Sequence, residues 1–195
     1  MLKVRNASPY KFSSDIYNNI NKDSNYLRGA AASDLSFIGL YKEALIQYDK
    51  PRNEIKKISA EDSVNFLINY HPVNARKFII QKAKENQILI FNEAHHNPRN
   101  RVFVTSLLKD LKNAGYKYFA AETFMNDSFF VKEKHPVFFT GFYTMEPQFG
   151  NLVREALKLN FTLYPYEAIP ITGGKQREIG EAKNLQTLLK KRPKR

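Results

Sequence analysis

The sequence contains no cysteine, and this absence excludes several kinds of chemistry together. Disulfide frameworks, thiolate metal sites and a cysteine nucleophile all require that residue. The chain also lacks a continuous apolar run of about eighteen residues, and Met1 to Phe12 contain no apolar segment of signal-peptide length. We therefore expect no membrane span and a cytoplasmic product as written, or a periplasmic or exported one if a longer parent carries a signal.

The composition is that of a chain able to bury one sizeable core. It has 195 residues, of which 43% are hydrophobic and 13% aromatic, and this length suits a single domain with an N-terminal extension. The net charge of +12 would favour nucleic acid, an anionic membrane surface or an acidic ligand, and it does not choose among them.

Three regions are distinguishable along the chain. Residues 1–32 are rich in Asn, Ser, Asp and Lys and show little periodicity, which is typical of a loosely ordered lead-in. Residues 33–84 have the apolar spacing of amphipathic helices and form a helical N-terminal segment. Residues 85–195 alternate short apolar runs with helical patterns, which predicts an α/β core.

The rhythm of this last region predicts its topology. Strands alternating with helices indicate right-handed crossovers and a parallel sheet covered by helices. We therefore expect an α/β fold with a parallel sheet of at least three strands and crossover helices, preceded by the helical N-terminal segment. The expected strands are Gln87–Asn92, Tyr116–Ala121 and Phe161–Tyr166, and the expected helices are Pro98–Ala114, Pro147–Leu159 and Gln176–Lys190.

A 23-residue stretch from Thr123 to Met145 interrupts the rhythm without clear periodicity. Connections of this length are often functional. The aromatic residues in this stretch suggest either the lining or lid of an apolar ligand site, or a small satellite core. They are Phe124, Phe129, Phe130, Phe138, Phe139, Phe142 and Tyr143.

Each expected strand is followed at once by a glutamate: Glu93, Glu122 and Glu167. Parallel sheets place ligands outside the carboxyl ends of their strands. Carboxylates gathered there must be offset by cations, protons or metal. Arg99 and Arg101 are candidates to clamp an anion or hold these carboxylates, and Arg177 is placed to reach Glu167, although such charges are more often only solvated.

The first of these glutamates is followed by a histidine pair, His95 and His96. Asn97 and Pro98 are good helix-start residues, so the pair precedes a helix N-terminus, which disfavours protonated imidazole. Because adjacent side chains generally point apart, we expect His96 to face the carboxylates as a general base or metal ligand. His95 would then make a structural hydrogen bond. The alternative is a pair that only orders the turn.

These residues resemble the erythromycin esterase-like superfamily, which includes haem-iron uptake lipoproteins and TIKI metalloproteases. The likeness covers Gln87 to Leu189, where Glu93, His95 and His96 precede a helix and a strand ending in Glu122. It implies an esterase that activates water with His96, Glu93 and Glu122. Family members usually have Gly where Asn92 stands, and they continue into further strands with another active-site His. The resemblance therefore implies a C-terminally truncated chain.

We therefore predict a hydrolase-like domain in which Glu93, His96 and Glu122 activate water against an ester or acyl bond of a small-molecule substrate. They would act directly or through a divalent metal bound by the same three residues. His95, Glu167 and Arg99 are the candidates for binding a cofactor. The second hypothesis is a haem- or metal-binding module without catalysis. The third, a basic nucleic-acid-binding protein, is suggested by net charge alone.

Overall fold

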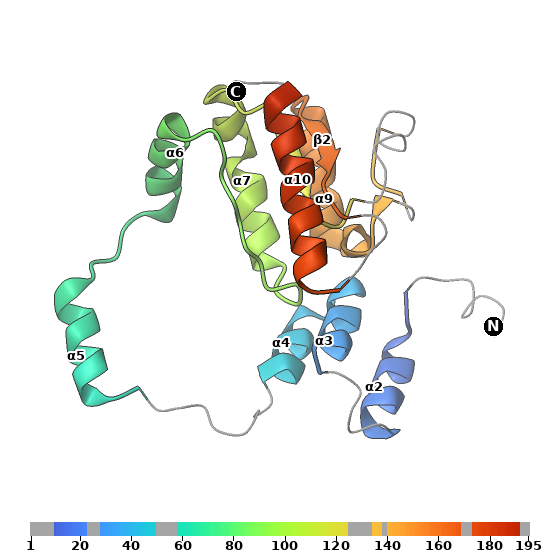
Figure 1. Cartoon of the computed structure of the whole chain (residues 1–195). Coiled ribbons are helices and arrows are strands. Elements are labelled where there is room, and N and C mark those ends of the chain that lie inside the picture. The colour runs from blue at the N-terminus through green and yellow to red at the C-terminus, as the bar shows by residue number, and fades with distance from the viewer. Residues whose placement is uncertain are drawn as a thin grey trace.

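The computed structural model describes residues 10–22, 28–49, 58–124, 134–137, 140–168 and 173–191. Helices account for most of these residues (Figure 1). They are α2 (Ser13–Lys22), α3 (Arg28–Phe37), α4 (Tyr41–Asp49), α5 (Ala60–Asn69), α6 (Ala75–Glu85), α7 (Arg99–Asn113), α9 (Pro147–Lys158) and α10 (Lys175–Lys191), with a short 3-10 helix η2 (Tyr143–Met145). The strands described are β1 (Tyr118–Ala121) and β2 (Thr162–Pro165).

The sheet is smaller than the sequence predicts. Strands β1 and β2 pair in parallel, with Tyr118 opposite Thr162 and Ala121 opposite Pro165. Helix α9 connects them, so one strand-helix-strand crossover is present as expected. The prediction of a parallel sheet with at least three strands is wrong, because the described residues form a two-stranded sheet in a mostly helical chain.

The missing strand is the apolar run Gln87–Asn92. Its residues make no ladder with β1, and Ile90 is 78% exposed. Contacts near both ends hold this segment: the Asn86 carbonyl accepts a hydrogen bond from the Tyr116 hydroxyl, and Glu93 pairs with Arg101 on α7. A short apolar run does not by itself distinguish a strand from another apolar segment. Here the segment contributes to the wall of a cavity beside β1 instead of extending the sheet.

The main core lies between α7, α9 and the sheet. Its buried side chains are Ala83, Val104, Leu107, Leu108, Leu111, Phe124, Phe149, Leu152, Val153, Ala156, Phe161 and Leu163. The core-facing residues of α7 and α9 recur at helical spacing, which is the pattern that predicted these helices. Helix α7 ends at Asn113 with Ala114 as its C-cap, and the next residue is Gly115, whose φ of 99° suits a residue without a side chain. The helix thus ends within one residue of Ala114, the end that the sequence predicted.

Helix α10 is attached beside the carboxyl end of β2. The Asn184 side chain donates hydrogen bonds to the carbonyls of Tyr166 and Glu167 at 3.0 and 3.1 Å. The Tyr164 hydroxyl donates to the Asn184 carbonyl at 3.1 Å. Asn184 therefore holds α10 where its first turns lie close to the strand end, which is the position the sequence predicted for Arg177.

The N-terminal helices form a second, smaller core. Ile16, Ala32, Leu35 and Ala44 of α2, α3 and α4 are fully buried together. The apolar spacing of residues 33–84 predicted amphipathic helices, and the structure begins this region with α3 and α4, which are separated at Gly39 with a φ of 80°. Helix α2 and the start of α3 lie within residues 1–32, the region predicted to be loosely ordered.

Helices α5 and α6 lead from this small core to the main one (Figure 1). Ser59 caps α5 by accepting a hydrogen bond from the Asp62 amide, and Asn74 caps α6 by accepting from the Lys77 amide. None of the residues of α5 is buried. Among the helices that the structure describes, none has the length and apolar character of a membrane span.

Candidate functional site

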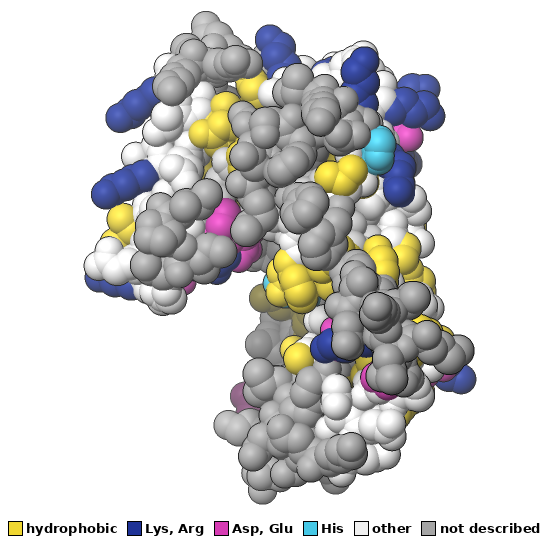
Figure 2. Space-filling model, turned by 90° about the vertical axis from the view of Figure 1, so that its right-hand side faces the viewer, with side chains coloured by type: hydrophobic (Ala, Val, Ile, Leu, Met, Phe, Trp, Pro, Cys, Tyr) yellow, Lys and Arg dark blue, Asp and Glu magenta, His cyan; other side chains and the backbone are white. Residues whose placement is uncertain are grey.

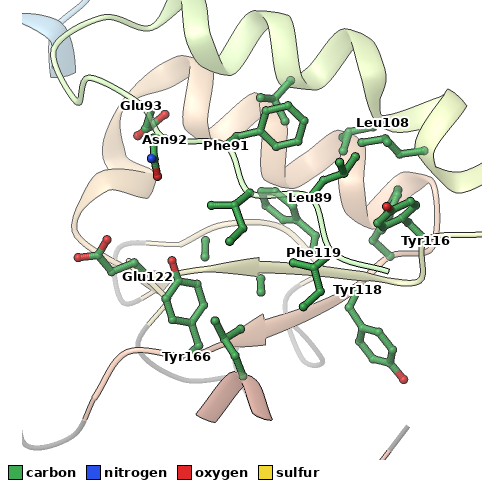
Figure 3. A pocket seen from close by; sticks show the side chains of 18 of the residues that line it. Leu89, Phe91, Asn92, Glu93, Leu108, Tyr116, Tyr118, Phe119, Glu122 and Tyr166 are labelled. Atoms are coloured by element: carbon green, nitrogen blue, oxygen red, sulfur yellow. The ribbon is translucent and has the colours of Figure 1, made fainter. Parts of the chain in front are cut away.

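A cavity of about 710 Å³ lies between residues 87–93 and β1, with walls completed by α7 and the end of α10 (Figure 3). Most of its wall is apolar, including Leu89, Leu108 and Phe119. Figure 3 shows Glu93 and Glu122 at the same end of this cavity. We call the whole space the trough and this end its acidic end.

Glu93 is held at the acidic end by a buried arginine. Its Oε1 lies 2.6 Å from Nη2 of Arg101, and its Oε2 accepts a hydrogen bond from Nε at 2.9 Å. Nη1 of Arg101 reaches Glu146, with 2.9 Å to Oε2. The side chains of Arg101 and Glu146 are both inaccessible to solvent. Arg101 therefore bridges two carboxylates, and this fixes the loop after residue 92 onto α7 and α9.

This environment keeps Glu93 ionised. Burial alone would raise the pKa of Glu93, but hydrogen bonds from His95 and Arg101, together with the charge of Arg101, lower the pKa below its ordinary value. Glu146 is fixed from the other side as well, because its carboxylate accepts the amide hydrogens of Gln148 and Phe149 as the N-cap of α9. Glu93 is thus a permanent anion at neutral pH.

The two histidines of the loop have different surroundings. His95 Nδ1 lies 3.3 Å from Oε1 of Glu93, and its ring stacks on Tyr143 with 4.0 Å between the ring centroids. The side chain of His95 is 42% exposed. His96 is buried and stacks on Tyr48 of α4 at 3.5 Å. The sequence prediction gave the carboxylate-facing position to His96, and the structure has His95 there.

The other two strand-end glutamates meet on Arg177 of α10. Its guanidinium donates to Glu167 through Nε at 2.8 Å and through Nη2 at 2.7 Å, and Nη2 also pairs with Glu122. Glu181, one turn along the helix, lies 3.1 Å from Nη2. Oxygen atoms of the three carboxylates all lie within 4.8 Å of one another, which is a spacing compatible with a shared cation. Arg177 supplies that cation.

The structure places the predicted site residues around two cavities. Glu93, His95 and Glu122 all line the trough. His96 lines a second cavity of about 560 Å³ beside α3 and α4, to which Glu93 and His95 also contribute. The tentative metal set Glu93, His96 and Glu122 is therefore divided between the two cavities.

Glu167 and Arg99 are the other residues predicted to bind a cofactor. Glu167 lies in the Arg177 cluster, beside the acidic end of the trough. Arg99 is an exposed residue at the start of α7, and its amide donates to the Asn97 side chain.

A close backbone contact places Tyr143 beside both clusters. A Cβ at Gly141 would lie 1.9 Å from the Thr123 carbonyl oxygen, so only glycine fits there. The Tyr143 amide then donates to the Thr123 hydroxyl at 2.9 Å. Burial raises the pKa of the Tyr143 phenol, and the charges of Glu122 and Glu93 add to the increase. The Tyr143 phenol is therefore close enough to both glutamates for their charges to raise its pKa, and its ring packs against His95.

Sequence reasoning did not identify Glu146 as a functional residue, and it named Tyr143 only among the aromatic residues that would line or cover an apolar ligand site or form a small satellite core. Glu146 precedes Pro147, a pattern typical of a helix start, and this signal could have located the cap but not its partner Arg101. Tyr143 and Phe142 lie in the aromatic stretch, where their rings meet edge to face, and both rings also contact Phe37 of α3 at tilted or edge-to-face angles. Phe124 belongs to the main core. Phe129, Phe130, Phe138 and Phe139 lie outside the described residues.

No family model, curated protein or solved structure matches this chain. The erythromycin esterase-like resemblance therefore stays a prediction. The function of the site is therefore inferred from its geometry and charges.

The Arg177 cluster makes stability depend on pH. Hydrogen bonds from Arg177 lower the pKa of Glu167 below its ordinary value. A carboxyl with a lowered folded-state pKa stabilises the protein above its unfolded pKa, and this contribution is lost as the pH falls through the folded value. We expect Glu167→Gln to lower the melting temperature most at pH 7, with the difference from wild type shrinking below about pH 5.

Thermal unfolding, monitored by circular dichroism at several pH values, gives the melting temperatures that test this prediction. Glu85→Gln is the control, because Glu85 pairs with Lys82 on the surface and its side chain is 52% exposed. A difference between wild type and Glu167→Gln that grows on acidification would contradict the assigned role of Glu167.

Proposed function

We propose that this chain hydrolyses an ester or similar acyl bond, with His95 as the general base and Glu93 as the carboxylate that orients it. One observation carries this proposal: Glu93 and His95, in contact with each other, line both the trough and the second cavity. A substrate with one part in each cavity would place the bond that joins those parts next to Glu93 and His95.

The contact between the two side chains suits water activation. When Nδ1 of His95 donates its hydrogen to Glu93, Nε2 carries a lone pair that can accept a proton from water. The resulting hydroxide adds to the carbonyl carbon, and the carbonyl oxygen becomes an oxyanion. Collapse of this intermediate breaks the bond to the leaving group, which takes the proton back from His95. Glu93 stabilises the imidazolium that forms between these two transfers.

Other residues at the acidic end have supporting roles in this proposal. Arg101 keeps Glu93 ionised and fixed, so the imidazole has one preferred orientation. Asn92 also lines the trough beside Glu93, and its side-chain amide is a hydrogen-bond donor for the developing oxyanion (Figure 3). Tyr143 packs against the face of His95. Preorganised groups of this kind lower the barrier because they need no reorganisation during the reaction.

Glu122 has an electrostatic role in this proposal. It lines the trough, and Arg177 pairs with it as well as with Glu167 and Glu181. The guanidinium already supplies the positive charge that a divalent metal would bring to these carboxylates. The proposed reaction therefore proceeds by proton transfer at His95 and uses no metal.

Haem binding is the second candidate function, because the trough combines apolar walls with an accessible imidazole at its end. A haem titration that gives no Soret shift would exclude it. Nucleic-acid binding is the third, and it requires a basic surface. On the face shown in Figure 2, Lys and Arg side chains are scattered and do not form one patch, so this observation favours the other two candidates.

The proposed function predicts that hydrolysis depends on the charge of Glu93. We expect the purified wild-type chain to hydrolyse a p-nitrophenyl acyl ester. Glu93→Gln should lower kcat/KM about a hundredfold, because a neutral amide orients the imidazole and stabilises the imidazolium less well than the carboxylate does. Release of p-nitrophenol is the measurement. Glu85→Gln is the matched control and keeps the wild-type rate. Equal rates for Glu93→Gln and wild type would refute the role of Glu93.

A further inference from the structure

The shape of the trough restricts what it can hold. It runs along β1, whose four residues span about 13 Å, and residues 87–93 form another of its walls. Leu185, Leu188 and Leu189 of α10 also line it, while Leu108 and Phe149 lie on its core side. An elongated apolar space of this kind fits a flexible hydrocarbon chain better than a compact polar molecule.

Charge is unevenly distributed along the trough. Around the acidic end, Arg101 pairs with Glu93 and Glu146, and Arg177 pairs with Glu122, Glu167 and Glu181. Five carboxylates thus face two guanidinium groups, although the protein as a whole carries a net charge of +12. Lys117 lines the part of the trough before β1, away from these carboxylates. The acidic end therefore disfavours a second anion.

We infer that the trough binds uncharged, straight-chain acyl compounds, with the hydrocarbon along β1 and the carbonyl head at the acidic end. This inference rests on the proposed function for the identity of the head group, since an ester is neutral before hydrolysis. Its product, a carboxylate, is repelled by Glu93 and Glu122. The same charge that selects the neutral substrate thus favours release of the acid.

The inference is tested by binding, without turnover. Decanamide and decanoate share one hydrocarbon chain and differ in head charge, so their dissociation constants at pH 7.5 compare the head group alone. We expect wild-type chain to bind decanamide about tenfold more tightly, because of like-charge repulsion at the acidic end. Glu122→Gln should narrow the difference by strengthening decanoate binding. Isothermal titration calorimetry gives both constants.

Two variants locate the binding. Ala120→Phe fills the trough from β1, and Leu189→Trp fills it from α10, where Leu189 is 38% exposed and tolerates change. Each should weaken decanamide binding at least about tenfold. Val102→Phe is the matched control, because Val102 is an exposed α7 residue. Circular dichroism shows which variants remain folded, and Leu189→Trp is decisive if Ala120→Phe unfolds.

The possible results separate this inference from the proposed function. Decanamide binding that the trough variants weaken, without any ester hydrolysis, would support the ligand class and refute the catalytic proposal. Tighter binding of decanoate than of decanamide would overturn the inference even if esters are hydrolysed. Equal affinity for both ligands, or binding unaffected by Leu189→Trp, would overturn it too.

Discussion

Arg101→Met is expected to destabilise the protein by about 3–5 kcal/mol. The Arg101 side chain has no solvent exposure and holds Glu93 and the fully buried Glu146. Methionine keeps part of the volume but removes the charge, which leaves two carboxylates without their cation. Removing one partner of a buried ion pair costs far more than the intact pair contributes, because the remaining charge stays desolvated.

Thermal and urea unfolding measure this effect. For a chain of this size, the expected loss lowers the melting temperature by roughly 10 °C. Arg76→Met is the control, because Arg76 forms an ion pair with Asp110 at 2.5 Å but its side chain is 47% exposed. Exposed pairs contribute about 0–1 kcal/mol, so this variant should unfold almost like wild type. A similar loss of stability in both variants would show that the buried Arg101 contributes no more to stability than an exposed ion pair does.

His95→Ala is expected to lower kcat/KM for an acyl ester by about 10²–10⁴. The variant removes the proposed general base, and water would then have to attack without proton transfer to an oriented imidazole. The side chain is 42% exposed and packs on one face against Tyr143, so its loss should change stability little. The effect therefore falls on the rate and not on the fraction of folded protein.

The measurement is initial-rate kinetics with a p-nitrophenyl acyl ester, on samples whose folding is checked by circular dichroism. His71→Ala is the matched control, since His71 is an exposed residue between α5 and α6. This control should keep the full rate. If His95→Ala and His71→Ala had equal kcat/KM values, the assignment of His95 as the base would be wrong.

Local sequence signals predicted most of the helices and two strands. Apolar residues at helical spacing located α7 and α9, and the predicted end of α7 at Ala114 is the C-cap of that helix. Gln87–Asn92 was predicted as a third strand because apolar content and length fit one. What the pattern could not show is that Glu93 and Asn86 tie this segment to Arg101 and Tyr116, which are distant in sequence.

The candidate site was predictable to a similar degree. Strand ends placed Glu122 and Glu167 together, and Arg177 reaches them from α10 as the sequence suggested. Glu93 belongs to a different cluster, because its segment is outside the sheet and Arg101 binds it. Spacing alone could not reveal this separation, since it depends on a buried partner from α7.

The choice between adjacent histidines also depended on tertiary contacts. The sequence predicted that the two rings point apart, and one does contact Glu93 while the other is buried. Which ring takes which position is decided by Tyr48 and Tyr143, each of which stacks on one imidazole. Neither tyrosine is near the pair in sequence, so no local pattern could identify the base.

The most direct test of the central claim compares His95→Ala with His96→Ala in two measurements, ester hydrolysis per folded molecule and melting temperature. His95 contacts Glu93 at the trough, whereas His96 is buried against Tyr48. We predict that His95→Ala loses the rate with a nearly unchanged melting temperature, and that His96→Ala melts earlier but keeps the rate. The reverse outcome, with the rate lost only in His96→Ala, would contradict the account.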